Sequence, residues 1–229
     1  MEELRTVGNL YQLFGRLLEE EIDAPLLRLL RGELREPLAA IGVTLPESFD
    51  QDPEETILEA LAEEYTGLLV APGAVSPYAS VFETGMLFKE PCDKAEAAYR
   101  EAGWAYQLRN SGEFADHIGT MLAFVGLLSH AEADALEQGD GEGAAVLRER
   151  RTRFLVEQLG GWGPGWCHRA AKAAFHPLYQ GIISAIEQLL WSELAKCAGR
   201  QQMKELMELN RREPPKLDYD ADFRKASGL

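Results

Sequence analysis

Cysteine is scarce in this chain of 229 residues. Only Cys92, Cys167 and Cys197 occur, far apart and without a C-x-x-C pair. An odd and scattered set argues against a disulfide framework, and it lacks the paired ligands of a zinc knuckle. Free cysteines of this kind are typical of a reducing compartment.

Long apolar runs are missing as well. No stretch approaches the roughly 18 consecutive apolar residues that a membrane-spanning helix requires. The N-terminal segment MEELRTVGNLYQLFGRLLEEE has acids at both ends, whereas a secretory leader has a basic start and an unbroken apolar stretch. We therefore expect a cytoplasmic protein with no stable membrane insertion.

Basic residues are outnumbered, with 23 lysines and arginines against 38 acidic residues and a formal charge of -15. Nucleic-acid binding depends on cations that neutralise phosphates, so this balance argues against a nucleic-acid partner. A basic peptide or a basic protein surface is the partner that the charge favours.

Alternation of apolar and polar residues with period two, the pattern of a half-buried strand, is absent. Apolar residues instead recur at helical spacing, which predicts an all-α fold. The expected helices cover residues 4–18, 24–42 with a break at Gly32 or Pro37, 54–70, 80–87, 91–103, 113–136, 144–159 and 167–197, the last kinked or split at Pro177. We expect one globular helical domain over residues 1–210 and an extended or disordered polar tail over residues 211–229.

The segment PGAVSPYASVFE, residues 72–83, interrupts this helical pattern. Pro72 and Pro77 fix their own φ angles and restrict the residues before them, so the crossing should be stiff. Stiff loops often carry function, and this one would present Tyr78. The alternative is a plain helix connection in which Tyr78 fills the core.

A second segment, EFADHIGTMLAFVGLL, begins at Glu113. As a helix it would bury a stripe made of Phe114, Ile118, Met121, Leu122, Val125 and Leu128. Asp116 would then lie on the opposite face and His117 at the margin, with Glu113 close to both. The small residues Gly119, Thr120, Ala123 and Gly126 would let another helix or a ligand approach closely.

The cluster of Glu113, Asp116 and His117 admits several interpretations. Its members could stabilise a helix start, contribute to a metal site, or act in a metal- or nucleotide-dependent hydrolase. The chain contains neither a Glu-x-x-His pair nor a G-x-S-x-G or G-x-x-x-x-G-K-[ST] motif. We therefore expect no catalytic residues, no metal and no cofactor.

Glycine-rich GGWGPGW, residues 160–166, holds Trp162 and Trp166. The two indoles could flank a binding groove, or they could anchor a helix junction from inside.

Three segments, EEYTGLLVAPGAVSPYASVFE, EFADHIGTMLAFVGLL and FLVEQLGGWGPGWCHRAAKAAFHPLY, resemble in order and spacing the TorD/DmsD/NarJ-like family of redox-enzyme maturation chaperones. The most specific feature is a Pro-aromatic-x-Ser-Val loop followed, after some 35 to 40 residues, by Asp-His. The resemblance covers most of residues 5–197.

This resemblance implies an all-α chaperone of the TorD-like type, without catalysis. Its partner would be the twin-arginine leader of a molybdenum (or tungsten) oxidoreductase catalytic subunit, held until the cofactor is inserted and before export. The peptide-binding positions carried over from the family are Leu68, Leu69, Pro77, Tyr78, Asp116 and His117, and we add their neighbours Ser80 and Glu113 and the aromatic Trp162.

Alternatives remain open at this point. The chain could be a NarJ-like assembly chaperone for a reductase subunit that is not exported, the hydrolase described above, or a purely structural helical adaptor. The client, the binding of a guanine nucleotide, and the choice between a monomer and a domain-swapped dimer are also open.

Overall fold

The computed structural model of the chain describes residues 1–70, 75–107 and 114–215. These residues form helices and loops with no β-strand among them, which confirms the predicted all-α class. The α-helices are α1 (Glu2–Glu19), α2 (Ala24–Arg31), α3 (Arg35–Ala40), α4 (Glu47–Gln51), α5 (Glu54–Tyr65), α6 (Ala79–Thr84), α7 (Glu90–Glu101), α8 (Ile118–Glu137), α9 (Gly141–Phe154), α10 (Gly163–Ala173), α11 (Pro177–Cys197) and α12 (Arg200–Arg211). Two π-helical segments, η1 (Thr66–Val70) and η2 (Leu155–Leu159), extend α5 and α9.

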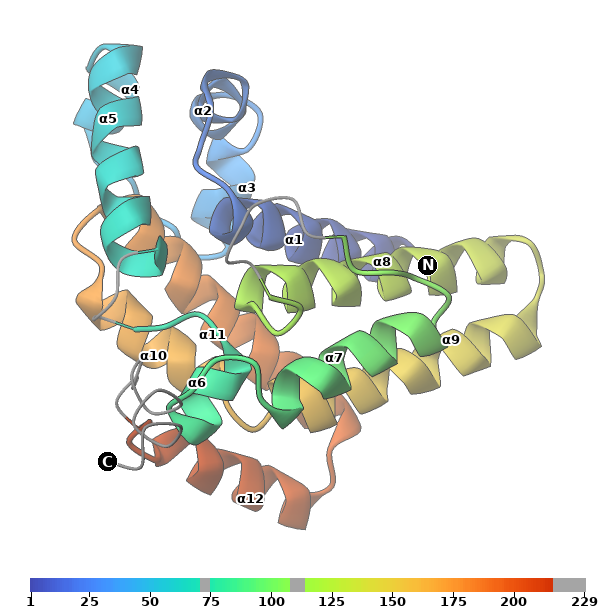
Figure 1. Ribbon diagram of the computed structural model, residues 1–229. Helices are drawn as coiled ribbons and strands as arrows, with labels where there is room; N and C mark the ends of the chain where they lie inside the picture. The colour runs from blue at the N-terminus through green and yellow to red at the C-terminus, as the bar shows by residue number, and fades with distance from the viewer. Residues whose placement is uncertain (71–74, 108–113, 216–229) are drawn as a thin grey trace, which may run out of the picture.

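The long helices make the body of the molecule. In Figure 1, α1 lies along α8, α8 and α9 form an antiparallel hairpin, and α10 and α11 pack against each other. The helices α2 to α5 stand at one end of this body, and α12 lies at the other. None of the described helices combines the length and the apolar character that a membrane span requires.

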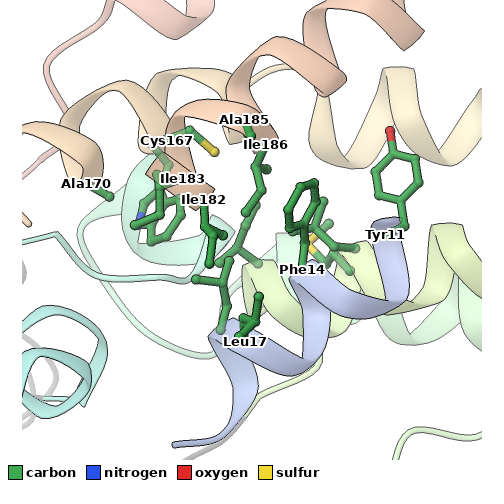
Figure 2. Close-up of a cluster of buried hydrophobic side chains, with 14 of the residues drawn as sticks. Tyr11, Phe14, Leu17, Cys167, Ala170, Ile182, Ile183, Ala185 and Ile186 are labelled. Carbon is green, nitrogen blue, oxygen red and sulfur yellow. The ribbon is translucent and has the colours of Figure 1, made fainter. Parts of the chain in front are cut away.

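The core forms where the apolar stripes of these helices meet. Tyr11, Phe14 and Leu17 lie on one face of α1 because they are spaced three residues apart, and all three are buried. Figure 2 shows them beside a second set of buried side chains from α10 and α11, which comprises Cys167, Ala170, Ile182, Ile183, Ala185 and Ile186. Full burial of one such aliphatic or aromatic side chain contributes about 1.5–3 kcal/mol, so this packing is a main source of stability.

The α1–α8 crossing is close because both helices carry small residues there. A Cβ atom added to Gly15 would lie 2.9 Å from the Cβ of Ala123 and 2.9 Å from the carbonyl oxygen of Gly119. The Gln12 side chain donates a hydrogen bond of 2.6 Å to the Ala123 carbonyl across the interface. The small face of α8 predicted to admit a helix or a ligand is therefore occupied by α1.

A charged network ties α8, α9 and α11 together. Arg151 on α9 pairs with Glu132 on α8 at 3.0 Å and with Glu193 on α11 at 3.5 Å. Both carboxylates are buried, so each needs the guanidinium to offset its lost hydration.

Several predicted boundaries are confirmed. The helix expected over residues 24–42 breaks at Gly32 and stops at Gly42, where φ is +88°. Gly103, with φ +85°, ends α7. Pro177 begins α11, so the predicted helix over residues 167–197 is split there.

Other boundaries are wrong. The helix predicted from residue 113 begins only at Ile118, and the segment 163–166, expected as a glycine-rich turn, is the first turn of α10. Helices α4 and α12 were not predicted. Residues 216–229 of the predicted tail lie outside the described part of the chain, so the proposed domain boundary stays a prediction.

Candidate peptide-binding site around Tyr78

The segment leading into α6 is held by backbone hydrogen bonds to the segment leading into α8. The Ile118 amide donates to the Pro77 carbonyl at 2.8 Å, and the Ala79 amide donates to the Asp116 carbonyl at 3.1 Å. Together they make an isolated antiparallel bridge between Tyr78 and His117. The predicted stiff crossing therefore exists over residues 75–79, while Pro72 lies outside the described residues.

Asp116 is a buried cap of α6. Its side chain has no exposed surface, and its Oδ2 accepts a hydrogen bond of 2.7 Å from the Ser80 amide. Its Oδ1 and the Ser80 hydroxyl, both buried, have no hydrogen-bond partner among the described residues. The prediction that Asp116 lies on the outer face of a helix is wrong, because the helix begins two residues later and Asp116 turns inward to the first turn of α6.

His117 caps α8 in a similar way. Its Nδ1 accepts a hydrogen bond of 3.1 Å from the Gly119 amide, and only 6% of the residue is exposed. Burial lowers the pKa of His117 to about 4, so the ring is neutral at pH 7 and carries its proton on Nε2. His117 is thus inside the core rather than at its margin.

Aromatic rings cover this buried pair. The Tyr78 ring lies 5.2 Å from the His117 ring and 5.4 Å from the Phe114 ring, measured between centroids. Phe88 follows at 3.8 Å from Phe114 and is 66% exposed. We call Tyr78, Phe88 and Phe114 the aromatic patch. It places apolar surface next to the two caps and in contact with solvent.

Phe88 adopts an unusual backbone conformation, with φ at +54°. A left-handed conformation costs a non-glycine residue roughly 1–2 kcal/mol, and such strain tends to collect at functional positions. Phe88 was not among the site residues predicted from the sequence. The available signal was the short apolar run of residues 86–88, which is too short to be a helix and follows the turn at Gly85, where φ is +74°.

Comparison with protein families shows where the chain belongs. Residues 28–168, more than half of the chain and including both halves of the Tyr78–His117 bridge, match the model of the nitrate reductase delta subunit family. The chain belongs to this family. The resemblance inferred from the sequence motifs is confirmed. A search of curated proteins gives no match.

Acidic side chains lie near the aromatic patch in this family member. Glu83 on α6 and Glu90 at the start of α7 are both exposed. Desolvation of its carboxyl group raises the pKa of Glu83, while the nearby charges of Arg212 and Lys94 oppose this shift. Glu90 pairs with Lys94 at 2.8 Å. Glu113, the third predicted acid, lies outside the described residues.

The other predicted residues are not part of this cluster. Leu68 and Leu69 on η1 are each 5% exposed, and Leu68 lines a separate hollow with Phe175 and His176. Trp162 is fully buried, packs 6.0 Å from the Phe82 ring, and donates from Nε1 to the Gln158 carbonyl at 2.7 Å. The structure thus favours the helix-junction anchor over the groove for Trp162.

Outside the site, the buried acids of the described ranges are paired with arginines in the network of α8, α9 and α11. Within the described ranges, no group of three or more His, Cys, Asp and Glu side chains is arranged to hold a metal ion. Asp116 and His117 are buried, and each uses one acceptor atom in a helix cap. Both side chains are therefore poorly placed to act on a substrate.

Proposed function

We propose that this protein is a cytoplasmic assembly chaperone for the catalytic subunit of a molybdenum (or tungsten) oxidoreductase. It binds the twin-arginine leader of that subunit and releases it after cofactor insertion, before export. Membership of the nitrate reductase delta subunit family carries this proposal, because the matched region contains the bridged segments that build the aromatic patch.

In the proposed complex the aromatic patch takes up apolar residues of the leader. Tyr78 and Phe88 supply ring surface. The segments that lead into α6 and α8 are held together beneath these rings by the hydrogen bonds of Pro77, Ser80 and Asp116 and by the packing of His117. Each leucine buried contributes about 2 kcal/mol before the cost of ordering a disordered peptide is subtracted.

The arginines of the leader would bind at the exposed carboxylates next to the patch. Asp116 is not available to them because it is buried as the cap of α6. Glu83 is the nearest exposed carboxylate, whereas an arginine at Glu90 would have to displace Lys94, which pairs with it at 2.8 Å. A charge-assisted hydrogen bond contributes about 1.5–3 kcal/mol in favourable cases and less at an exposed site. The apolar segment therefore dominates affinity, and the charges set register and association rate.

A second candidate follows from the description of the matched family, which names a nitrate reductase subunit. In that case the client is a reductase subunit that is not exported, and the bound region is not a twin-arginine leader. The two candidates share the aromatic patch and differ in the charge of the client peptide.

The first experiment is an affinity pull-down from the native host grown anaerobically, followed by mass spectrometry. Wild type is compared with a Tyr78→Ala, Phe88→Ala double variant, and Val146→Ala, an exposed residue on α9, serves as control. Wild type and the control should retain a molybdoenzyme catalytic subunit that the double variant loses. If folded wild type retains no such subunit, the chaperone proposal is wrong.

Peptides derived from the retained client then separate the two candidates. For a twin-arginine leader, replacing both arginines should weaken binding less than replacing the leucines with serine. Binding that is indifferent to the arginines at both low and high salt would instead favour a client segment other than a twin-arginine leader.

A further inference from the structure

A hollow beside α5 is lined by none of the residues of the aromatic patch. It has a volume of about 590 Å³ and lies between α5 with η1 and the α10–α11 junction. Its lining includes Ala60, Glu63, Leu68, Ala173, Phe175 and His176. The lining thus combines apolar side chains with the carboxylates of Glu63 and Glu64.

Phe175 stands open to solvent at this hollow, with 90% of its surface exposed. Its backbone is nevertheless fixed, because its amide donates to Glu64 Oε1 at 2.7 Å and the preceding Ala174 carbonyl accepts from the Gln180 side chain at 2.6 Å. The backbone at Phe175 is thus fixed on both sides while its ring stays in contact with solvent.

The charge around the hollow has one sign. Residues 54–70, which form one wall, contain five glutamates and no lysine or arginine. The Glu63 carboxylate is exposed and makes no hydrogen bond or ion pair with the described residues. His176 adds no positive charge near neutral pH, because burial lowers its pKa despite the opposing effect of Glu64.

We propose that this hollow is a second contact site for the client peptide, which receives an apolar stretch against Phe175 and Leu68 and a neighbouring basic residue at Glu63. The inference rests on the proposed function and extends it from one patch to two. A second copy of the chain is the poorer occupant, since two molecules of charge -15 repel each other.

Binding of a synthetic peptide tests this site directly. The probe is a fluorescein-labelled peptide with two adjacent arginines followed by a stretch rich in leucine and alanine, and fluorescence anisotropy gives the dissociation constant. Phe175→Ala should weaken binding about tenfold, as expected of a central aromatic contact. Phe175→Leu, which keeps apolar bulk, should lose no more than about threefold.

Charge at the rim is tested separately. Glu63→Gln should weaken binding roughly threefold at low salt and hardly at all at high salt, because an exposed charge is screened. Val146→Ala and Glu149→Gln on α9 are the matched apolar and acidic controls, and both should bind like wild type. All variants should keep the melting temperature of wild type, since the changed side chains are exposed.

The outcomes distinguish this inference from the proposed function. If wild type fails to bind the peptide, the second site and the binding of a twin-arginine leader are both overturned. The Tyr78→Ala, Phe88→Ala double variant should also bind less well. If it does, while Phe175→Ala and Glu63→Gln leave binding unchanged, only the second site is overturned. A benzophenone amino acid at position 175 should photocrosslink to the leucine-rich stretch, and a crosslink confined to other parts of the peptide also overturns it.

Discussion

The α1–α8 crossing and the segments around Tyr78 are built on opposite principles. At the crossing, glycines bring two helix backbones so close together that a Cβ atom added to Gly15 would clash with α8. Around Tyr78, two non-helical segments are joined by a short bridge, pinned by buried polar caps, and covered by rings that remain partly in water.

The difference shows how rigidity and accessibility are combined in one small protein. Close backbone packing tolerates almost no change but offers no surface. A capped and bridged loop holds a shape while leaving apolar groups exposed, at the cost of buried polar atoms without partners and one strained backbone conformation. Four substitutions measure this contrast.

The largest loss of stability is expected for Gly15→Leu at the crossing. The new Cβ would lie 2.9 Å from backbone and side-chain atoms of α8, and the helices would have to separate. We expect a loss of about 3 kcal/mol or more in the free energy of unfolding, measured by urea denaturation. Gly141→Leu, where nothing lies within 4 Å of the added Cβ, should change it by no more than about 0.5 kcal/mol. Equal effects at both positions would refute the close crossing.

His117 should make the Tyr78 region sensitive to acid. Its pKa is about 4 when folded and 6.5 when unfolded, so between these values the unfolded chain binds a proton that the folded chain does not. Its contribution is fully present above pH 6.5 and is lost as the pH falls towards 4, by up to about 3 kcal/mol. His117→Asn keeps a capping acceptor without titrating, so its stability should fall less steeply over this range. Parallel pH profiles for wild type and variant would show that His117 is not buried.

Asp116→Ala should cost about 2 kcal/mol, because the buried Ser80 amide and the first turn of α6 lose their acceptor. The matched variant is Asp140→Ala, since Asp140 Oδ1 accepts from the Gly143 amide at 2.9 Å in an exposed cap of α9. That exposed cap should be worth about 1 kcal/mol or less. Thermal melts of the two variants give the comparison. A smaller loss of stability in Asp116→Ala than in Asp140→Ala would contradict the buried cap.

The smallest effect concerns Phe88. Its φ of +54° favours glycine, so Phe88→Gly should be more stable than Phe88→Ala by about 1 kcal/mol. Both variants lose the ring and should bind client peptide equally poorly. If urea denaturation shows Phe88→Ala to be as stable as Phe88→Gly or more stable, the backbone at position 88 is not strained.

Much of the fold was predictable because helical periodicity is a local property of the sequence. The spacing of Tyr11, Phe14 and Leu17 identifies the buried face of α1, and glycines 32, 42 and 103 mark where helices end. The start of α8 was predicted wrongly because Phe114 fits the apolar stripe of a longer helix. The capping ability of Asp116 and His117 was the competing local signal, and it prevails.

The candidate site was only partly predictable. Its loop and the Asp116–His117 pair were found from motifs, yet their burial could not be, since burial depends on which segment lies opposite. Phe88 has only the short apolar run of residues 86–88 as a sequence signal and Phe175 has none, so the exposure of both rings became apparent only in the structure.

By itself, the sequence determined the helical class, the acidic surface and the stiffness of the loop around Pro77, because each depends on residue type and local spacing. The tertiary structure alone decided that α1 fills the small face of α8, that Asp116 and His117 turn inward as caps, and that Phe88 and Phe175 remain in water. These outcomes depend on contacts between residues far apart in the chain, where packing and the need to pair buried polar groups outweigh local preference.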